Sequence, residues 1–229
     1  MGIVENYFEE GWEEVVKIYK EDWKNNLKKY GKKYGKKAIN YLLDHFYSEA
    51  DVESFLSCFM RDKLREETHY NSEYVVRNQV RFGTMDYDKN IELEKLKNLK
   101  IFMKKEKVKK NNFIPDIVID SLSNPNNGTF LLFAELTYQP SYNEYYKTGD
   151  SNPLIMLREK ADEEARTLTA AIDAKIIESG YICIISDELV SKYKDLKMIR
   201  DLKKKYHEIN FLVNGMTLKE KLNIIYENS

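Results

Sequence analysis

The chain has 229 residues, of which 42% are hydrophobic and 33% charged, as is typical of a globular protein. Its 37 Lys and Arg residues nearly balance 38 Asp and Glu residues, so any signal for a nucleic-acid or an acidic partner must be local. No stretch approaches the ~20 apolar residues of a membrane helix. The segment 1–10 holds three glutamates and no apolar run like that of a secretory leader, so we expect a cytoplasmic protein.

The first part of the chain is predicted to be helical. Apolar side chains recur at helical spacing over residues 5–30, and a second stripe runs over residues 38–67. Gly31 and Gly35 separate the two helices within a lysine-rich run. Residues 74–82 then alternate between apolar and polar side chains, which predicts the first strand.

A highly charged excursion follows, over residues 83–112, with a short helix near Leu93–Ile101. Residues 114–121 and 130–138 are predicted strands. The segment between them contains Asn-Pro-Asn-Asn-Gly at 124–128, and Asn-Gly between apolar runs indicates a β-hairpin.

The rest of the chain alternates between helices and strands. This order predicts a mixed sheet flanked by helices. The expected elements are a helix over 154–179 that stops at Gly180, a strand over 181–186, a helix over 189–206, a strand over 209–213 and a final helix from Thr217.

Two carboxylates are expected to meet at the open end of the hairpin. A turn centred near Asn126 and Asn127 places Asp116 opposite residue 135, 136 or 137. Registers that pair Asp116 with 135 or 137 put it on the same face as Glu135 and Thr137, because strand side chains alternate. Two ionised carboxylates about 4 Å apart repel by roughly 4 kcal/mol at an effective dielectric near 20, so a shared proton or a cation is expected between them.

An ordered set of short motifs surrounds this pair. The segment 48–53 (Ser-Glu-Ala-Asp-Val-Glu) lies on a predicted helix, the strand 74–82 follows, and then come Pro115-Asp116 and 133–137 (Phe-Ala-Glu-Leu-Thr). In order and spacing, residues 38–186 resemble the PD-(D/E)XK nuclease superfamily. The resemblance implies an α/β fold with a restriction-endonuclease-like αβββαβ core. The chain would then form a single domain with a helix and basic segment at 1–37 and a C-terminal extension at 187–229.

The resemblance implies a divalent-metal site that hydrolyses phosphodiester bonds. Asp116 and Glu135 would ligate Mg²⁺ or Mn²⁺, together with the backbone carbonyl of Leu136, since hard cations prefer oxygen ligands. Glu49 would be the carboxylate of the core helix. Glu53 lies one helical turn further on and is the alternative.

Thr137 departs from the family pattern, which has lysine at this position to stabilise charge on the phosphate. One possibility is that another residue supplies the cation: Lys160 on the next helix is the first candidate. The other is that the chemistry has been lost and the protein only binds nucleic acid or another protein. Weaker candidates for the cation are Arg158, Lys147, Arg77 and Arg81.

Two lysine-rich runs could contact nucleic-acid phosphates. Residues 24–37 hold seven lysines interleaved with tyrosines, and residues 95–110 hold eight. Charge runs are more often solvated faces, and the resemblance to nucleases is what favours a DNA-binding role here. The expected partner is DNA, with a homodimer possible, and the expected contacts are Lys32, Lys33, Lys36 and Lys37.

Overall fold

A computed structural model of the protein describes most of the chain. The helices, strands and side-chain contacts of the structure are those of this described part. It comprises residues 2–40, 48–68, 73–79, 93–108, 114–121, 129–139, 153–191 and 193–227.

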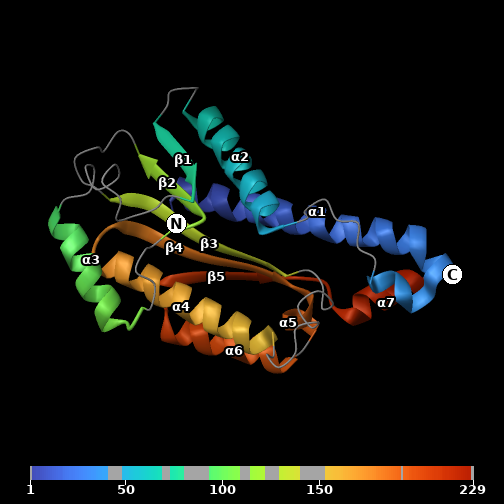
Figure 1. Ribbon diagram of the computed structural model, residues 1–229. Helices are drawn as coiled ribbons and strands as arrows, with labels where there is room; N and C mark the ends of the chain where they lie inside the picture. Colours follow the sequence, from blue (N-terminus) through green and yellow to red (C-terminus); the bar gives the residue numbers. More distant parts are fainter. Residues whose placement is uncertain are drawn as a thin grey trace.

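The centre of the molecule is an open five-stranded mixed sheet with the strand order β1-β2-β3-β4-β5 (Figure 1). The first three strands are antiparallel to one another, whereas β3, β4 and β5 run parallel. The strands are β1 Tyr74–Asn78, β2 Ile117–Ser121, β3 Phe130–Gln139, β4 Ile177–Ser186 and β5 Ile209–Asn214.

Helices cover both faces of the sheet, and each face has its own apolar core. The face that holds Tyr181 and Cys183 of β4 packs against α1 Ile3–Tyr34, α2 Glu49–Glu67 and α7 Leu218–Glu227. The face that holds Ile182 and Ile184 packs against α3 Leu93–Lys105, α4 Pro153–Asp173, α5 Asp187–Ser191 and α6 Tyr193–Lys205. The expected α/β architecture with a mixed sheet and flanking helices is confirmed.

Strand β4 starts earlier than the sequence pattern indicated. Helix α4 ends at Asp173, and Lys175 has a left-handed backbone (φ 57°), so the chain turns and enters β4 at Ile177. Gly180 therefore lies inside the strand, and its prediction as a helix stop was wrong. A Cβ there would lie 3.0 Å from Ile209 Cδ1, so glycine permits close packing of β4.

The predicted helix over 38–67 also differs from the structure. A 3₁₀ helix, η1, runs over Gly35–Asn40, and α2 begins anew at Glu49. Ser48 caps α2: its backbone N–H donates to Asp51 Oδ2 at 2.9 Å, and its hydroxyl accepts from the Asp51 N–H at 3.4 Å. This cap starts the helix at Glu49, although the apolar stripe alone suggested one long helix.

Strand β1 ends at Asn78 because Gln79 takes a left-handed backbone conformation (φ 48°). The prediction for its last residues, 80–82, lies outside the described residues, as do the hairpin turn at 124–128 and the candidate cations Arg81 and Lys147. Among the helices that the structure describes, none has the length and apolar character needed to span a bilayer.

Candidate functional site

Strands β2 and β3 separate at one end of their antiparallel pairing. The last pair on this side is Ile117 with Ala134. Asp116 lies just before β2 and outside this pairing, and its carboxylate is near Glu49 and Glu53 of α2. That Asp116 and Glu135 share one face stays a prediction. Strand β3 continues to Gln139, so part of its backbone runs beyond β2. We call this region, from Asp116 to the β3 backbone at Leu136 and Tyr138, the β2–β3 fork.

Three charged side chains bond to the β3 backbone at the fork, where a further strand pair would otherwise lie. The N–H of Leu136 donates to Asp116 Oδ2 at 2.6 Å, and the N–H of Tyr138 donates to Glu49 Oε2 at 3.3 Å. Lys160 Nζ donates to the Leu136 carbonyl at 3.2 Å. Asp116, Glu49 and Lys160 therefore satisfy backbone groups of β3 in place of a partner strand.

Glu49 reaches the fork because α2 begins beside it. The Ser48 cap fixes the helix start, and Glu49 is the first residue of α2. Its carboxylate binds Lys160 Nζ, at 3.2 Å from Oε2 and 3.5 Å from Oε1. The fork thus brings α2 from one face of the sheet into contact with α4 from the other.

In the contacts that the structure describes, the polar neighbours of the Lys160 ammonium are all oxygen atoms. Besides Glu49 and the Leu136 carbonyl, its ammonium lies 3.6 Å from Oε1 of Glu164, one turn further along α4. Burial lowers the pKa of Lys160, but the charges of Glu164 and Glu49 more than offset this effect, and the pKa is raised. Lys160 is therefore held as a cation, with 41% of its side chain still exposed.

Asp116 is the most perturbed carboxyl group at the fork. Burial raises its pKa to about 6, and the negative charges of Glu49 and Glu53 add to the rise. The Leu136 N–H and the positive charge of Lys160 act in the opposite direction. A carboxyl group that titrates near neutral pH, beside other carboxylates, is typical of functional sites.

Glu53, on α2, is a buried carboxylate of the site. It is 5% exposed and accepts a hydrogen bond from the Gln79 side-chain amide at 2.9 Å. Burial raises the pKa of Glu53, and Glu49 contributes in the same direction. Gln79 also donates its backbone N–H to the Asp116 carbonyl at 3.0 Å, so the end of β1 ties Glu53 to Asp116. Both alternatives for the helix carboxylate, Glu49 and Glu53, lie at the site.

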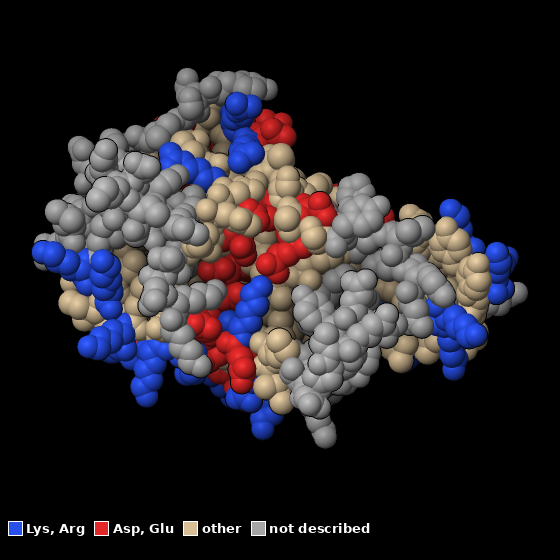
Figure 2. Space-filling model, in the orientation of Figure 1, with Lys and Arg blue, Asp and Glu red and all other residues tan. Residues whose placement is uncertain are grey.

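The two remaining predicted residues lie on β3. Glu135 is 5% exposed, and Thr137 is half-buried on the same face of the strand. Figure 2 shows that acidic side chains gather in a band across the middle of the molecule in this view, with a basic group among them. Within the described part of the chain, however, no three Asp, Glu, His or Cys side chains are arranged as a group that could hold a metal ion.

The other two candidate cations that the structure describes, Arg158 and Arg77, lie near other groups. Arg158 is exposed on the outer side of α4, where it lines a surface cavity with Asp162 and Arg166. Arg77 lies beside Asp120, where its charge opposes the rise in pKa that burial causes for Asp120. Among the described candidates, Lys160 is the one that contacts the β3 backbone.

The four lysines predicted to contact DNA are exposed, but they lie elsewhere. Lys32 and Lys33 are in the last turn of α1, and Lys36 and Lys37 are in η1. Figure 1 shows that this end of α1 projects with α7 beyond the sheet, away from the fork. The structure therefore does not bring these lysines and the carboxylates together.

The sequence pattern did not indicate Glu164, although it is 1% exposed and contacts Lys160. The available signal was its spacing: a residue four positions after Lys160 on one helix shares its face.

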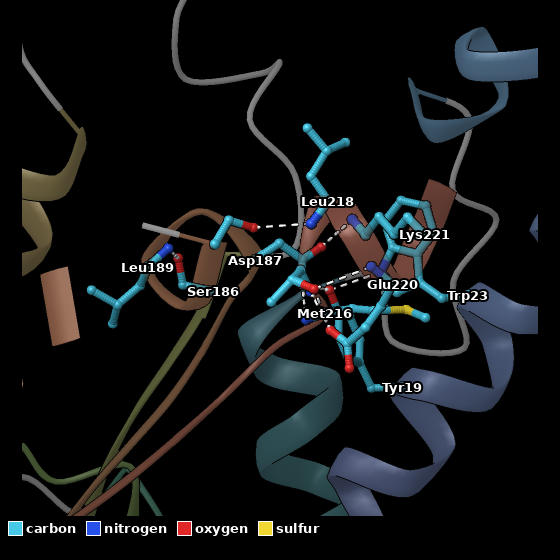
Figure 3. Close-up of polar contacts among 11 residues, drawn as sticks. Tyr19, Trp23, Ser186, Asp187, Leu189, Met216, Leu218, Glu220 and Lys221 are labelled. Atoms are coloured by element: carbon cyan, nitrogen blue, oxygen red, sulfur yellow. Dashed lines mark hydrogen bonds and ion pairs between the residues drawn. The ribbon is translucent and has the colours of Figure 1, made fainter. Parts of the chain in front are cut away.

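A second charged cluster, just after the C-terminal ends of β4 and β5, was also missed (Figure 3). The carboxylate of Asp187 accepts hydrogen bonds from Tyr19 Oη and the Met216 N–H, each at 2.6 Å, and forms an ion pair with Lys221. The ammonium of Lys221 also lies 3.3 Å from the ring centroid of Trp23. Because Lys221 is only 4% exposed, we interpret this cluster as a link that fixes α7 to α1 and the sheet.

Comparison with protein-family models, with curated proteins and with solved structures found no match.

Proposed function

We propose that the protein is a divalent-metal-dependent nuclease with a restriction-endonuclease-like core, acting on DNA in the cytoplasm. One observation carries the proposal: Lys160 comes from α4 to the β3 backbone beside Asp116 and Glu49, next to the position where Thr137 replaces the expected lysine. The element order α2, β1, β2, β3, α4, β4 supports it, since it matches the order that the resemblance implies apart from the inserted α3.

The donors at the fork have the chemistry that Mg²⁺ or Mn²⁺ requires. Asp116, Glu135 and the Leu136 carbonyl would hold the ion, and all three offer oxygen. The Leu136 carbonyl and Glu49 already bind a cation, the Lys160 ammonium. When bound, such an ion polarises a phosphodiester and lowers the pKa of a coordinated water.

Side chains near the metal would bind the phosphate and hold the site in place. Lys160, held as a cation by Glu49 and Glu164, would bind a non-bridging phosphate oxygen and stabilise charge that develops there. Glu53, buried and bonded to Gln79, would fix the end of β1 against Asp116. Thr137 offers only a hydroxyl and would contribute no charge.

A DNA-cleavage assay tests the proposal. Supercoiled plasmid is incubated with the protein and Mg²⁺ or Mn²⁺, and nicked and linear products are measured. Asp116→Ala and Lys160→Met should each abolish cleavage, whereas Asp62→Ala, which removes an exposed carboxylate of α2, should leave it intact. Full activity in Asp116→Ala would refute the site.

A second function is favoured by two observations together. Thr137 lacks the charge of the expected lysine, and the described carboxylates do not form a group arranged to hold a metal. The same fold could then bind nucleic acid or a protein without cutting. Metal-independent DNA binding, with no cleavage of plasmid in Mn²⁺, would identify this case.

A further inference from the structure

The far edge of the sheet carries a groove that the proposed nuclease site does not use. In the described part of the chain, no strand pairs with the outer side of β5. A cavity of about 580 Å³ follows this edge between α1 and α6. Its lining includes the consecutive β5 residues 211–214, whose side chains point alternately to the two faces, so the cavity lies along the strand edge itself.

Strand β5 lacks the features that usually protect an edge strand. Residues 209–214 (Ile-Asn-Phe-Leu-Val-Asn) contain neither a charged residue nor proline. Edge strands normally carry such residues, because their unpaired N–H and C=O groups otherwise attract another strand. The opposite edge strand, β1, does carry Arg77. The β5 edge is therefore suited to pairing with an extended chain.

The two walls of the groove have opposite charges. Glu9 and Glu13 of α1 line one wall, and Arg200 and Lys203 of α6 line the other. The helices lie on opposite faces of the sheet, since α1 packs on the face of Leu212, whereas α6 packs on the face of Phe211. A strand added beside β5 would thus meet acidic groups on one face and basic groups on the other.

This charge distribution disfavours a second copy of the chain as the occupant. Two identical edge strands related by a two-fold axis pair antiparallel in one continuous sheet, and the axis is perpendicular to that sheet. Each face then continues into the same face of the partner. Glu13 would lie toward Glu13 of the other copy, and Lys203 toward its Lys203, so like charges would meet along both walls.

We propose that the β5 edge binds an extended segment of a different protein by strand addition. Its side chains toward α1 would be basic, and those toward α6 acidic, which a strand achieves by alternating Lys or Arg with Asp or Glu. Main-chain hydrogen bonds to β5 would provide the attachment. Contacts with Glu13 and Lys203 would determine which side chains of the bound segment point toward α1 and which point toward α6.

A defined peptide tests this inference on the full chain. The probe is a fluorescein-labelled peptide of about eight residues, with lysine and glutamate alternating around a central pair of valines. Fluorescence anisotropy measures binding, and amide chemical shifts of residues 209–214 report its location. A second peptide of identical sequence with N-methylated backbone amides cannot form the ladder.

The variants Glu13→Lys and Lys203→Glu should each weaken binding about tenfold. Their matched controls, Glu10→Lys and Lys204→Glu, change exposed neighbours that do not line the groove and should bind normally. The N-methylated peptide should not bind. The inference is overturned if the unmethylated peptide does not bind, if binding is unaffected by Lys203→Glu or by N-methylation, or if sedimentation shows a dimer in which the β5 amides are protected.

Discussion

Replacing Asp116 by asparagine should stabilise the metal-free protein at neutral and alkaline pH. Asparagine keeps an oxygen that can accept the Leu136 N–H, at present 2.6 Å from Asp116 Oδ2, but it cannot ionise. Burial raises the pKa of Asp116 to about 6, against an ordinary value of 3.8. The folded state therefore binds the Asp116 proton more tightly than the unfolded state does.

The sign and size of the effect follow from this difference. The raised pKa contributes stability that is fully present below pH 3.8 and is lost as the pH rises through about 6. At 1.36 kcal/mol per pKa unit, the wild type loses at most about 3 kcal/mol between these limits. The Asp116→Asn variant loses none of this. Its advantage should be near zero at pH 4 and grow to about 1–3 kcal/mol by pH 8.

Urea unfolding followed by tryptophan fluorescence measures this advantage, because Trp12 and Trp23 are both buried in α1. The free energies of unfolding of wild type and variant are compared between pH 4 and pH 8, without divalent metal. Asp201→Asn, which alters an exposed side chain of α6, is the control and should show no such pH-dependent difference. A difference between Asp116→Asn and wild type that stays constant with pH, or that shrinks as pH rises, would refute the assignment of Asp116 as a destabilising buried carboxylate.

Three further predictions concern other positions. Lys160→Gln removes the ammonium that now binds the Leu136 carbonyl and Glu49. Calorimetric titration should therefore show Mn²⁺ binding about tenfold more tightly, a gain of roughly 1.4 kcal/mol. Weaker binding would mean that Lys160 does not compete with the metal. Asp187→Ala leaves Lys221 buried without its carboxylate and should cost about 3–5 kcal/mol, lowering Tm by roughly 6–20 °C. Differential scanning calorimetry measures this loss of Tm. The double variant Asp187→Leu/Lys221→Met should lose less stability than Asp187→Ala, and equal losses would contradict this. Gly180→Val should cost about 1–3 kcal/mol in urea unfolding, because the side chain would press on Ile209, and an unchanged midpoint would exclude that close packing.

Much of the sheet could be predicted because its strands have strong local patterns. Residues 130–138 and 209–213 were each predicted within one residue of β3 and β5. The Asn-Gly signal limited the pairing of Asp116 to three positions, and the observed register, with Ile117 opposite Ala134, agrees with that range. Lys160 was identified because a missing charge at Thr137 required a source, and α4 follows β3 directly.

The remainder depended on packing across long separations. Gly180 resembles a helix stop in the sequence, and only the proximity of Ile209 shows why a strand requires glycine there. The Asp187–Lys221 pair joins residues 34 positions apart in the chain, and neither residue belongs to a recognisable motif. In contrast, the start of α2 was predictable in principle, since Ser48 followed by Asp51 has the spacing of a capping box.

The two residues of the Asp187–Lys221 ion pair are synthesised at different times. The two residues are 34 positions apart, so at about 5–20 residues per second the ribosome makes the carboxylate roughly 2–7 s before the lysine. During this interval β4 can form, but the Asp187 side chain at its end has no lysine to neutralise it. A nascent chain arrested before α7 would therefore lack both the ion pair of Asp187 and the ammonium that lies over the Trp23 ring.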